Sequence, residues 1–336
     1  MKIFTEISPA FYKTKLLNAI SQKEKILVAY IEVRNRPFRD SDFLRGEKKF
    51  DHVSITGNFF KKCYKLASLL KASRYEELIV GGYDRIYCWL SVICSPRKKN
   101  AVIIESTLRD TKKCGLRAFM KRLFFKRVSK AYVCGKSHAD LVRFFGFNGT
   151  IVDIGSVGYI RRVPQPTYQK REKVEQFLYV GRLAPVKNLQ WTIQRFASHP
   201  NLQLTIIGTG ELEDRLKQNA PANVHFMGAV PNTELPRYYQ EADVFVLPSY
   251  YEPYGLVVEE ALNNGTPVLV SNMIGCQDNL VAANNAGLVF DVDDIDDFEN
   301  KLDRIRDVQT YNQFRENISK LDFAKLEENM VNAFIG

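Results

Sequence analysis

The segment VFVLPSYYEPYGLVVEEALNNGTPVLVS, residues 244–271, contains two short apolar runs separated by a stretch with the composition of a helix. The runs at 244–248 and 267–271 are rich in valine and leucine and do not alternate with polar residues, which is typical of strands buried on both faces. Residues 256–263 between them have helical spacing. A strand, a helix and a strand in this order predict part of a parallel sheet covered by helices.

The same alternation continues on both sides of this segment. Further apolar runs of strand length in the second half of the chain occupy residues 177–183, 202–208, 224–228 and 287–290. Helical stretches separate them at 188–199, 211–218 and 233–241. The second half is therefore predicted to be a doubly wound α/β domain.

The first half repeats the pattern less regularly, and its strand candidates are 25–33, 52–56, 77–82, 101–106, 130–135 and 150–155. Two prolines and a run of charges interrupt the pattern at RRVPQPTYQKREKVE, residues 161–175, which indicates a domain boundary. We expect an N-terminal Rossmann-like domain at 1–165, a C-terminal one at 171–320 and a tail helix at 321–336. Two such domains in tandem predict a cleft between them, where the carboxyl ends of the strands meet a ligand.

Composition and charge limit the classes of function. The chain has 336 residues, of which 45% are hydrophobic and 26% charged, so wholesale disorder is excluded. Residues 1–170 carry 34 Lys+Arg against 14 Asp+Glu, a net +20, whereas residues 171–336 carry 14 against 24, a net −10. The basic half predicts an anionic partner, namely nucleic acid, an anionic lipid surface or a phosphorylated substrate. The alternative is a solvated basic surface without a partner.

Two basic amphipathic stretches of the first half, around 112–130 and 59–71, suit an anionic membrane surface. In the alternative, their apolar faces pack on the sheet and their cations face water. No apolar run approaches the ~20 residues that cross a bilayer, and the N-terminus lacks the core of a signal peptide. We therefore expect a cytoplasmic protein, peripheral on the inner face of the cytoplasmic membrane.

The cysteines and histidines do not have the spacing of a metal site. The six cysteines contain no C-x-x-C and the four histidines no H-E-x-x-H, so we expect reduced thiols and no metal. The acidic run DVDDIDD at 291–297 contains D-x-D, which could hold a divalent ion. Because the run follows a strand and precedes a helix, we favour helix capping for it.

The chemistry-bearing residues lie in the second half, in GRLAPVKN (181–188), IIGTGELEDRL (206–216), VHFMGAVP (224–231) and the segment at 249–271. Arg182 and Lys187 follow a strand end, where two cations can neutralise a diphosphate. The first free amides of the helix after Gly255, at Leu256 and Val257, can bind the distal phosphate. Glu252 and Glu260, eight residues apart, can accept hydrogen bonds from the hydroxyls of a donor sugar and a ribose.

This combination resembles the nucleotide-sugar-binding domain of the retaining GT-B glycosyltransferases of family four, and the resemblance covers 177–290 closely. It implies a GT-B fold and gives the matching residues the roles just described, with Arg182, Lys187 and Glu252 catalytic. It also implies that Gly208 and Gly210 allow close backbone approach and that Ala229–Pro231, including Val230 and Pro231, line the base. The tail helix is expected to return to the first domain. GTGELE lacks the third glycine of a dinucleotide fingerprint, which argues against an NAD-dependent enzyme.

The first half departs from the family pattern. The loop after the first strand, Glu6–Pro9, has no glycine. The later loop IIESTLRD, residues 103–110, offers Glu105 and Ser106 where many relatives have a histidine near the reaction centre. We assign Glu105 as a catalytic candidate. The family mechanism is same-face attack assisted by the leaving group, which needs no enzymic nucleophile.

These observations predict a retaining hexosyltransferase that uses a nucleotide diphosphate sugar, by default a UDP-sugar, and no metal or other cofactor. Its acceptor is expected to be a lipid-linked or phosphorylated saccharide in bacterial surface polysaccharide or lipopolysaccharide assembly. The alternatives are a GT-B-shaped sugar-nucleotide epimerase, which needs no acceptor, and a non-enzymic nucleic-acid-binding protein. The basic segments lack the motifs of the latter.

Overall fold

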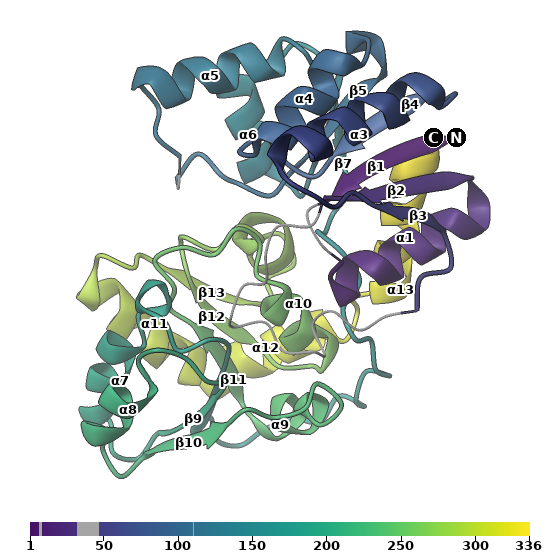
Figure 1. Cartoon of the computed structure of the whole chain (residues 1–336). Helices are drawn as coiled ribbons and strands as arrows, with labels where there is room; N and C mark the ends of the chain where they lie inside the picture. The colour runs from purple at the N-terminus through teal and green to yellow at the C-terminus, as the bar shows by residue number, and fades with distance from the viewer. Residues whose placement is uncertain (7–8, 32–46, 110) are drawn as a thin grey trace. The chain divides into compact units, whose positions relative to one another are not determined.

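The computed structural model describes residues 1–6, 9–31, 47–109 and 111–336. The chain forms two compact units, the first made of Met1–Tyr159 with Ala324–Gly336 and the second of Ile160–Phe323 (Figure 1). The chain therefore leaves the first unit once and returns to it for its last residues.

The first unit is built on a seven-stranded parallel sheet in the order β3-β2-β1-β4-β5-β6-β7. Its strands are β1 Lys2–Glu6, β2 Ile26–Tyr30, β3 Asp51–Ser54, β4 Glu77–Val80, β5 Asn100–Ile104, β6 Lys130–Val133 and β7 Thr150–Asp153. The predicted strands are present, but most end earlier than expected because the glycines and polar residues after them belong to loops. Residues 32–33 of the first predicted strand lie outside the described residues.

Helices cover both faces of this sheet. They are α1 Phe11–Lys23, α3 Phe59–Ala72, α4 Ile86–Cys94, α5 Gly115–Phe125 and α6 Lys136–Phe144. The rings of Trp89 in α4 and Phe124 in α5 lie 5.2 Å apart, and those of Phe125 and Phe145 lie 6.4 Å apart, so α4, α5 and α6 share one face. Side chains from α3 and α4 join β1, β2 and β4 in the same core.

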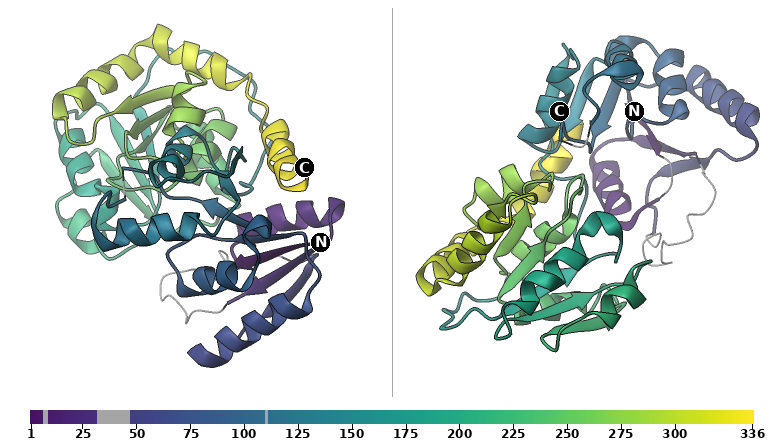
Figure 2. Two further views of the ribbon diagram at one scale, coloured as in Figure 1. Left: turned by 90° about the horizontal axis from the view of Figure 1, so that it is seen from above. Right: turned by 90° about the vertical axis from the view of Figure 1, so that its left-hand side faces the viewer.

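Helix α13, Phe323–Ile335, packs on the other face of the first unit. The ring of Phe334 lies 4.5 Å from Tyr132 in β6 and 5.9 Å from Phe4 in β1. Lys23 at the end of α1 donates a hydrogen bond to Asn332 at 3.1 Å, so α1 and α13 lie side by side (Figure 2). The last residues of the chain thus complete the core of the first unit.

Helix α5 has one apolar face that packs in the core and a second one that is exposed, so the packing interpretation of its sequence is confirmed for the first face only. Phe124 and Phe125 are buried in the core. Leu116, Phe119 and Met120 are 75%, 54% and 40% exposed. The cation of Lys121 lies over the rings of Tyr83 and Phe145 at 5.2 and 5.3 Å, so its half-buried side chain packs on the edge of the core.

The second unit has a six-stranded parallel sheet in the order β10-β9-β8-β11-β12-β13. Its strands are β8 Gln176–Val180, β9 Gln203–Ile207, β10 Val224–Gly228, β11 Val244–Leu247, β12 Val268–Ser271 and β13 Gly287–Phe290. The order reverses between β8 and β11, since the chain builds outward from β8 on one side and from β11 on the other. Such a switch point is where open α/β sheets bind ligands.

The helices of this unit are α7 Leu189–Ala197, α8 Glu213–Gln218, α9 Leu235–Glu241, α10 Leu256–Asn263, α11 Ile295–Arg306 and α12 Val308–Ile318. The ring of Trp191 in α7 lies 4.8 Å from that of Phe298 in α11, so these two helices share a face. The bounds of β10, α10 and β13 are those predicted from sequence. Helix α12 and the π-helical turn at Gln277–Ala282 were not predicted.

Two predictions from the sequence apply to both units: that no segment crosses a membrane, and that the cysteines are reduced thiols. Within the ranges described above, no helix has both the length and the apolar character to cross a membrane. In the described part of the chain the six cysteines form no disulfide with one another, and Cys114 is exposed.

Candidate functional site

The loops that follow β8 and β11 meet at the switch point of the second unit. Arg182 and Lys187 lie in the loop after β8, and Glu252 lies in the loop after β11. The amide of Tyr250 donates to the carbonyl of Val186 at 2.9 Å, which ties the two loops together. Lys187 and Glu252, which are 65 positions apart in the sequence, are thereby brought together.

Lys187 and Glu252 form an ion pair, and their side chains are only 14% and 19% exposed. Separating a partly buried ion pair leaves each charge without compensation, which is unfavourable. Each of the two side chains therefore holds the other in position. Arg182 is exposed, and its backbone carbonyl accepts a 3.0 Å hydrogen bond from the buried hydroxyl of Tyr179. Burial and the nearby Glu252 carboxylate raise the pKa of Tyr179, which keeps this donor protonated.

The Glu252 loop is fixed from a second side by the loop after β12. The Glu252 amide donates to the Met273 carbonyl at 3.3 Å, and the Gly275 amide donates to the Glu252 carbonyl at 3.0 Å. A Cβ on Gly275 would lie 1.9 Å from the Pro253 oxygen, so only glycine permits this approach. The position of the carboxylate is therefore set by backbone contacts.

Helix α10 begins directly after this loop. Gly255 caps it with a φ of +101°, a conformation that favours glycine, and a glycine offers no side chain to bind the first amides. The first-turn amides of Leu256 and Val257 have no carbonyl partner within the helix. With Lys187 near the same loop, the end of the helix is suited to a phosphate group.

Glu260 lies on the second turn of α10. Its carboxylate accepts a 3.1 Å hydrogen bond from the hydroxyl of Tyr239, a buried residue. Burial and Glu260 raise the pKa of Tyr239 well above its ordinary value, so the phenol remains a donor. The neighbouring Glu259 is buried and accepts from Tyr254 at 3.2 Å, so the two adjacent carboxylates have different partners. No motif in the sequence indicated that these tyrosines orient the carboxylates.

Gly208 and Gly210, after β9, allow close contact with the backbone of the loop that carries Arg182. A Cβ on Gly208 would lie 2.0 Å from the Gly181 oxygen, and one on Gly210 would lie 2.3 Å from the Leu183 oxygen. Val230 is half-buried and Pro231 exposed, both just beyond β10 at the same edge of the sheet. The assignment of these two residues to a base site rests on this position alone and stays a prediction.

The acidic run at 291–297 caps a helix. Asp294 is the N-cap of α11 and accepts from the Asp297 amide at 3.0 Å, while Asp297 in turn accepts from the Asp291 amide at 2.8 Å. Among the described residues, no three or more His, Cys, Asp or Glu side chains gather as metal ligands would.

Glu105 follows β5 in the first unit and is held by Lys13. The Lys13 ammonium lies 2.9 Å from Glu105 and 3.2 Å from Glu6 at the end of β1. Burial alone would lower the pKa of Lys13, but the two carboxylates outweigh it and raise that pKa well above its ordinary value. Burial raises the pKa of Glu6, against the effect of Lys13. The sequence singled out Glu105 and missed Lys13, which holds it, and Glu6, which shares that lysine.

Comparison with known proteins identifies what the second unit is similar to. Residues 164–321 match the family described as Glycosyl transferases group 1. This part, just under half of the chain, is similar to the members of that family. The resemblance inferred from the motif is therefore confirmed.

Two relatives from Escherichia coli match parts of the chain. O-antigen chain mannosyltransferase B is 30% identical over 180 residues, which cover 48% of this chain and 46% of the relative. UDP-Gal:alpha-D-GlcNAc-diphosphoundecaprenol alpha-1,3-galactosyltransferase is 32% identical over 151 residues, 42% of this chain and 39% of the relative. Each match therefore spans less than half of the relative's own length.

Solved structures match the whole chain. The apo form of the lipopolysaccharide outer core galactosyltransferase WaaB has a TM-score of 0.75 at 16% identity, covering 100% of this chain and 99% of that one. Anabaena HepE in complex with UDP and glucose has a TM-score of 0.70 at 15% identity, covering 100% and 99%. The fold is that of the GT-B glycosyltransferases, as predicted.

Proposed function

We propose that the chain is a retaining glycosyltransferase that moves a hexose from a nucleotide diphosphate sugar to a saccharide acceptor. The observation that carries this proposal is the Lys187–Glu252 pair, fixed beside the N-terminus of α10 at the switch point of a group 1 domain. Cations, free amides and a fixed carboxylate at one strand edge are the groups that a sugar diphosphate requires.

In this proposal the donor diphosphate binds Arg182, Lys187 and the first amides of α10. Lys187 then exchanges part of its interaction with Glu252 for the phosphate, and Glu252 accepts hydrogen bonds from the sugar hydroxyls. Glu260, oriented by Tyr239, accepts from the ribose hydroxyls. The nucleotide end is completed by Gly208, Gly210, Val230 and Pro231.

Transfer breaks the bond between the anomeric carbon and the diphosphate oxygen, and the electron pair leaves with the nucleotide. The acceptor oxygen bonds to the same face of the anomeric carbon, and its proton passes to the departing phosphate. Arg182 and Lys187 stabilise the charge that develops on that phosphate. Glu105 is proposed to act on the acceptor side. No metal is required.

The names of the relatives support bacterial surface polysaccharide or lipopolysaccharide assembly as the setting. The galactosyltransferase relative is named for a UDP-sugar and a lipid diphosphate acceptor, and one structural neighbour contains UDP and glucose. We therefore favour a UDP-sugar donor and a lipid-linked or phosphorylated acceptor. The family match disfavours nucleic-acid binding as the main function.

The acceptor chemistry suggests work at the inner face of the cytoplasmic membrane. The exposed Leu116, Phe119 and Met120 of α5 lie among exposed cations, including Arg117 and Arg122. Apolar side chains surrounded by cations suit the boundary of an anionic bilayer.

A thermal-shift panel tests the donor assignment. UDP, GDP, ADP and their sugar conjugates would be added in EDTA to the wild type and to Glu260→Ala. One nucleotide series should raise the unfolding temperature of the wild type and raise that of Glu260→Ala much less. A ligand at a hundred times its Kd stabilises by about 2.7 kcal/mol. Absence of any shift, or a shift that requires a metal, would contradict the proposal.

A further inference from the structure

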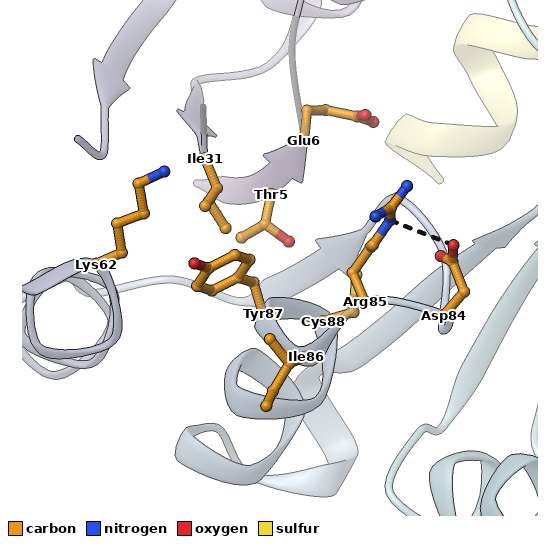
Figure 3. Close-up of a pocket in the computed structure, with 10 residues that line it drawn as sticks. Thr5, Glu6, Ile31, Lys62, Asp84, Arg85, Ile86, Tyr87 and Cys88 are labelled. Carbon is orange, nitrogen blue, oxygen red and sulfur yellow. Dashed lines mark ion pairs between the residues drawn. The ribbon is translucent and has the colours of Figure 1, made fainter. Parts of the chain in front are cut away.

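The first unit has its own switch point, between β1 and β4, and a cavity of about 490 Å³ lies there (Figure 3). Residues at the carboxyl ends of β1, β2 and β4 line it, together with Lys62 of α3 and the first turn of α4. None of these residues was assigned a role above, except that Glu6 pairs with Lys13. The cavity is a second place where this fold can bind a ligand.

Strand alternation decides which side chains of β1 enter the cavity. Successive side chains of a strand point to opposite faces, so Thr5 and Glu6 diverge. Thr5 points into the cavity, and the Glu6 carboxylate points away from it, toward Lys13 (Figure 3). Thr5 is 4% exposed, and its hydroxyl oxygen has no hydrogen-bond partner in the described part of the chain. A buried hydroxyl without a partner is costly, and a ligand in this cavity would supply one.

The cavity can also hold an anion. Helix α4 begins at Ile86, and its N-cap residue, Arg85, makes no side-chain hydrogen bond to the first turn, which lines the wall. Free amides at the start of a helix bind phosphate groups. Lys62 and Arg85 reach the cavity from α3 and from the start of α4 (Figure 3). Arg85 pairs with Asp84 at 3.4 Å, a long contact to a carboxylate that is 68% exposed.

An apolar surface continues from the rim of the cavity. Ile86 lines the cavity and is 58% exposed. The ring of Tyr87 lies 6.0 Å from Phe59, which lies 5.4 Å from Phe60. Phe60 is 80% exposed, on the same helix as Lys62. The cavity, lined by two cations and by the carboxylates of Glu6 and Asp84, therefore opens beside an exposed aromatic path.

We propose that this cavity binds the phosphate of a lipid-linked acceptor, with its apolar chain along Ile86, Phe59 and Phe60. The phosphate would lie at the start of α4 between Lys62 and Arg85 and accept a hydrogen bond from Thr5. The inference rests on the proposed function in one respect, namely that the lipid phosphate belongs to the acceptor. The acceptor would then be an amphiphile with a phosphate next to a hydrocarbon chain.

Farnesyl diphosphate, titrated into the full chain by calorimetry below its micellar concentration, tests this inference. Lys62→Gln and Arg85→Gln should each weaken binding about tenfold, the effect of losing one charge-assisted contact. Phe60→Ser should weaken the binding of farnesyl diphosphate but not the binding of inorganic pyrophosphate. Lys61→Gln, on the same helix but outside the cavity, is the matched control and should bind as the wild type does.

Lys187→Met separates this cavity from the diphosphate site of the second unit, and farnesyl diphosphate binding should survive it. Absence of binding to the wild type, or equal losses in Lys61→Gln and Lys62→Gln, would overturn the inference. The inference would also be overturned if the cavity bound membrane lipid instead. In that case phosphatidylglycerol vesicles would bind in a manner that depends on Lys62 and Arg85, and farnesyl diphosphate would not bind. UDP titration of the same samples reports on the donor site independently, so failure of one claim is distinguishable from failure of the other.

Discussion

Gly208 shows how single residues set the geometry of the donor loops. Its φ is +131°, and a Cβ at this position would lie 2.0 Å from the Gly181 oxygen, so any other residue is excluded. We expect Gly208→Ala to destabilise the protein by more than about 2 kcal/mol, because backbone strain and a clash add. Gly228→Ala is the control, since its φ is also positive, at +68°, but nothing in the described structure lies within 4 Å of the added methyl group.

Urea unfolding of both variants measures this difference. Gly228→Ala should lose only about 1 kcal/mol, the cost of the left-handed backbone alone. Equal losses in the two variants would show that the contact between the loops after β8 and β9 does not matter to stability.

The raised pKa of Glu6 leads to a second prediction at this scale. In the unfolded chain this carboxyl ionises near 4.5, and in the folded protein it ionises at higher pH because it is buried. The folded state then binds more protons between these two values, so the Glu6 contribution to stability falls as the pH rises through that window. Glu6→Gln removes this fall, and its free energy of unfolding should increase relative to the wild type as the pH rises above 4.5. If the free energies of unfolding of the two proteins changed with pH in parallel, the raised pKa of Glu6 would be refuted.

At the scale of elements, helix α13 stabilises the first unit by burying apolar side chains against its sheet. Phe334 is 1% exposed, between the rings of Phe4 and Tyr132. Phe334→Ala should cost about 3–5 kcal/mol, the range for removing a buried phenylalanine. Glu328→Ala, an exposed position on the same helix, should cost less than about 0.5 kcal/mol. Chemical denaturation measures both, and a small loss for Phe334→Ala would mean that the helix is dispensable.

The exposed face of helix α5 leads to a prediction about membranes. Leu116→Ser together with Phe119→Ser should reduce sedimentation with phosphatidylglycerol vesicles and leave the unfolding temperature within about 2 °C, because both side chains are exposed. Lys121 is unsuitable for such a test because it packs on Tyr83 and Phe145. Unchanged vesicle binding of the double variant would exclude α5 as the contact.

The elements themselves were largely predictable from sequence, and the contacts between them were not. Residues 256–263 were predicted as a helix and 224–228 as a strand because their apolar spacing is local. The Lys187–Glu252 pair, the Tyr239–Glu260 hydrogen bond and the Thr5 cavity depend on which strands become neighbours. Sequence spacing gives no information on that order, so these features required the structure.

At the scale of the whole molecule, the chain is two α/β units of opposite charge, each with a switch point at the strand ends. The second unit matches a glycosyltransferase family and carries the groups that we propose to bind a nucleotide sugar. The first unit carries the basic surface and the cavity beside α4. These differences are the basis for our proposal that the donor binds the second unit and the acceptor the first.

Calorimetric titration of UDP in EDTA tests the central claim most directly. The wild type should bind one nucleotide, and Lys187→Met should bind it about 10- to 100-fold more weakly, because a charged hydrogen bond contributes about 1.5–3 kcal/mol. Lys217→Met is the control and should bind like the wild type, since this lysine lies on the surface of α8 and pairs with Glu213 at 2.7 Å. If GDP or ADP binds in place of UDP, the same comparison applies to that nucleotide. If none of these nucleotides binds, or if Lys187→Met binds as tightly as the wild type, the switch point of the second unit is not the donor site.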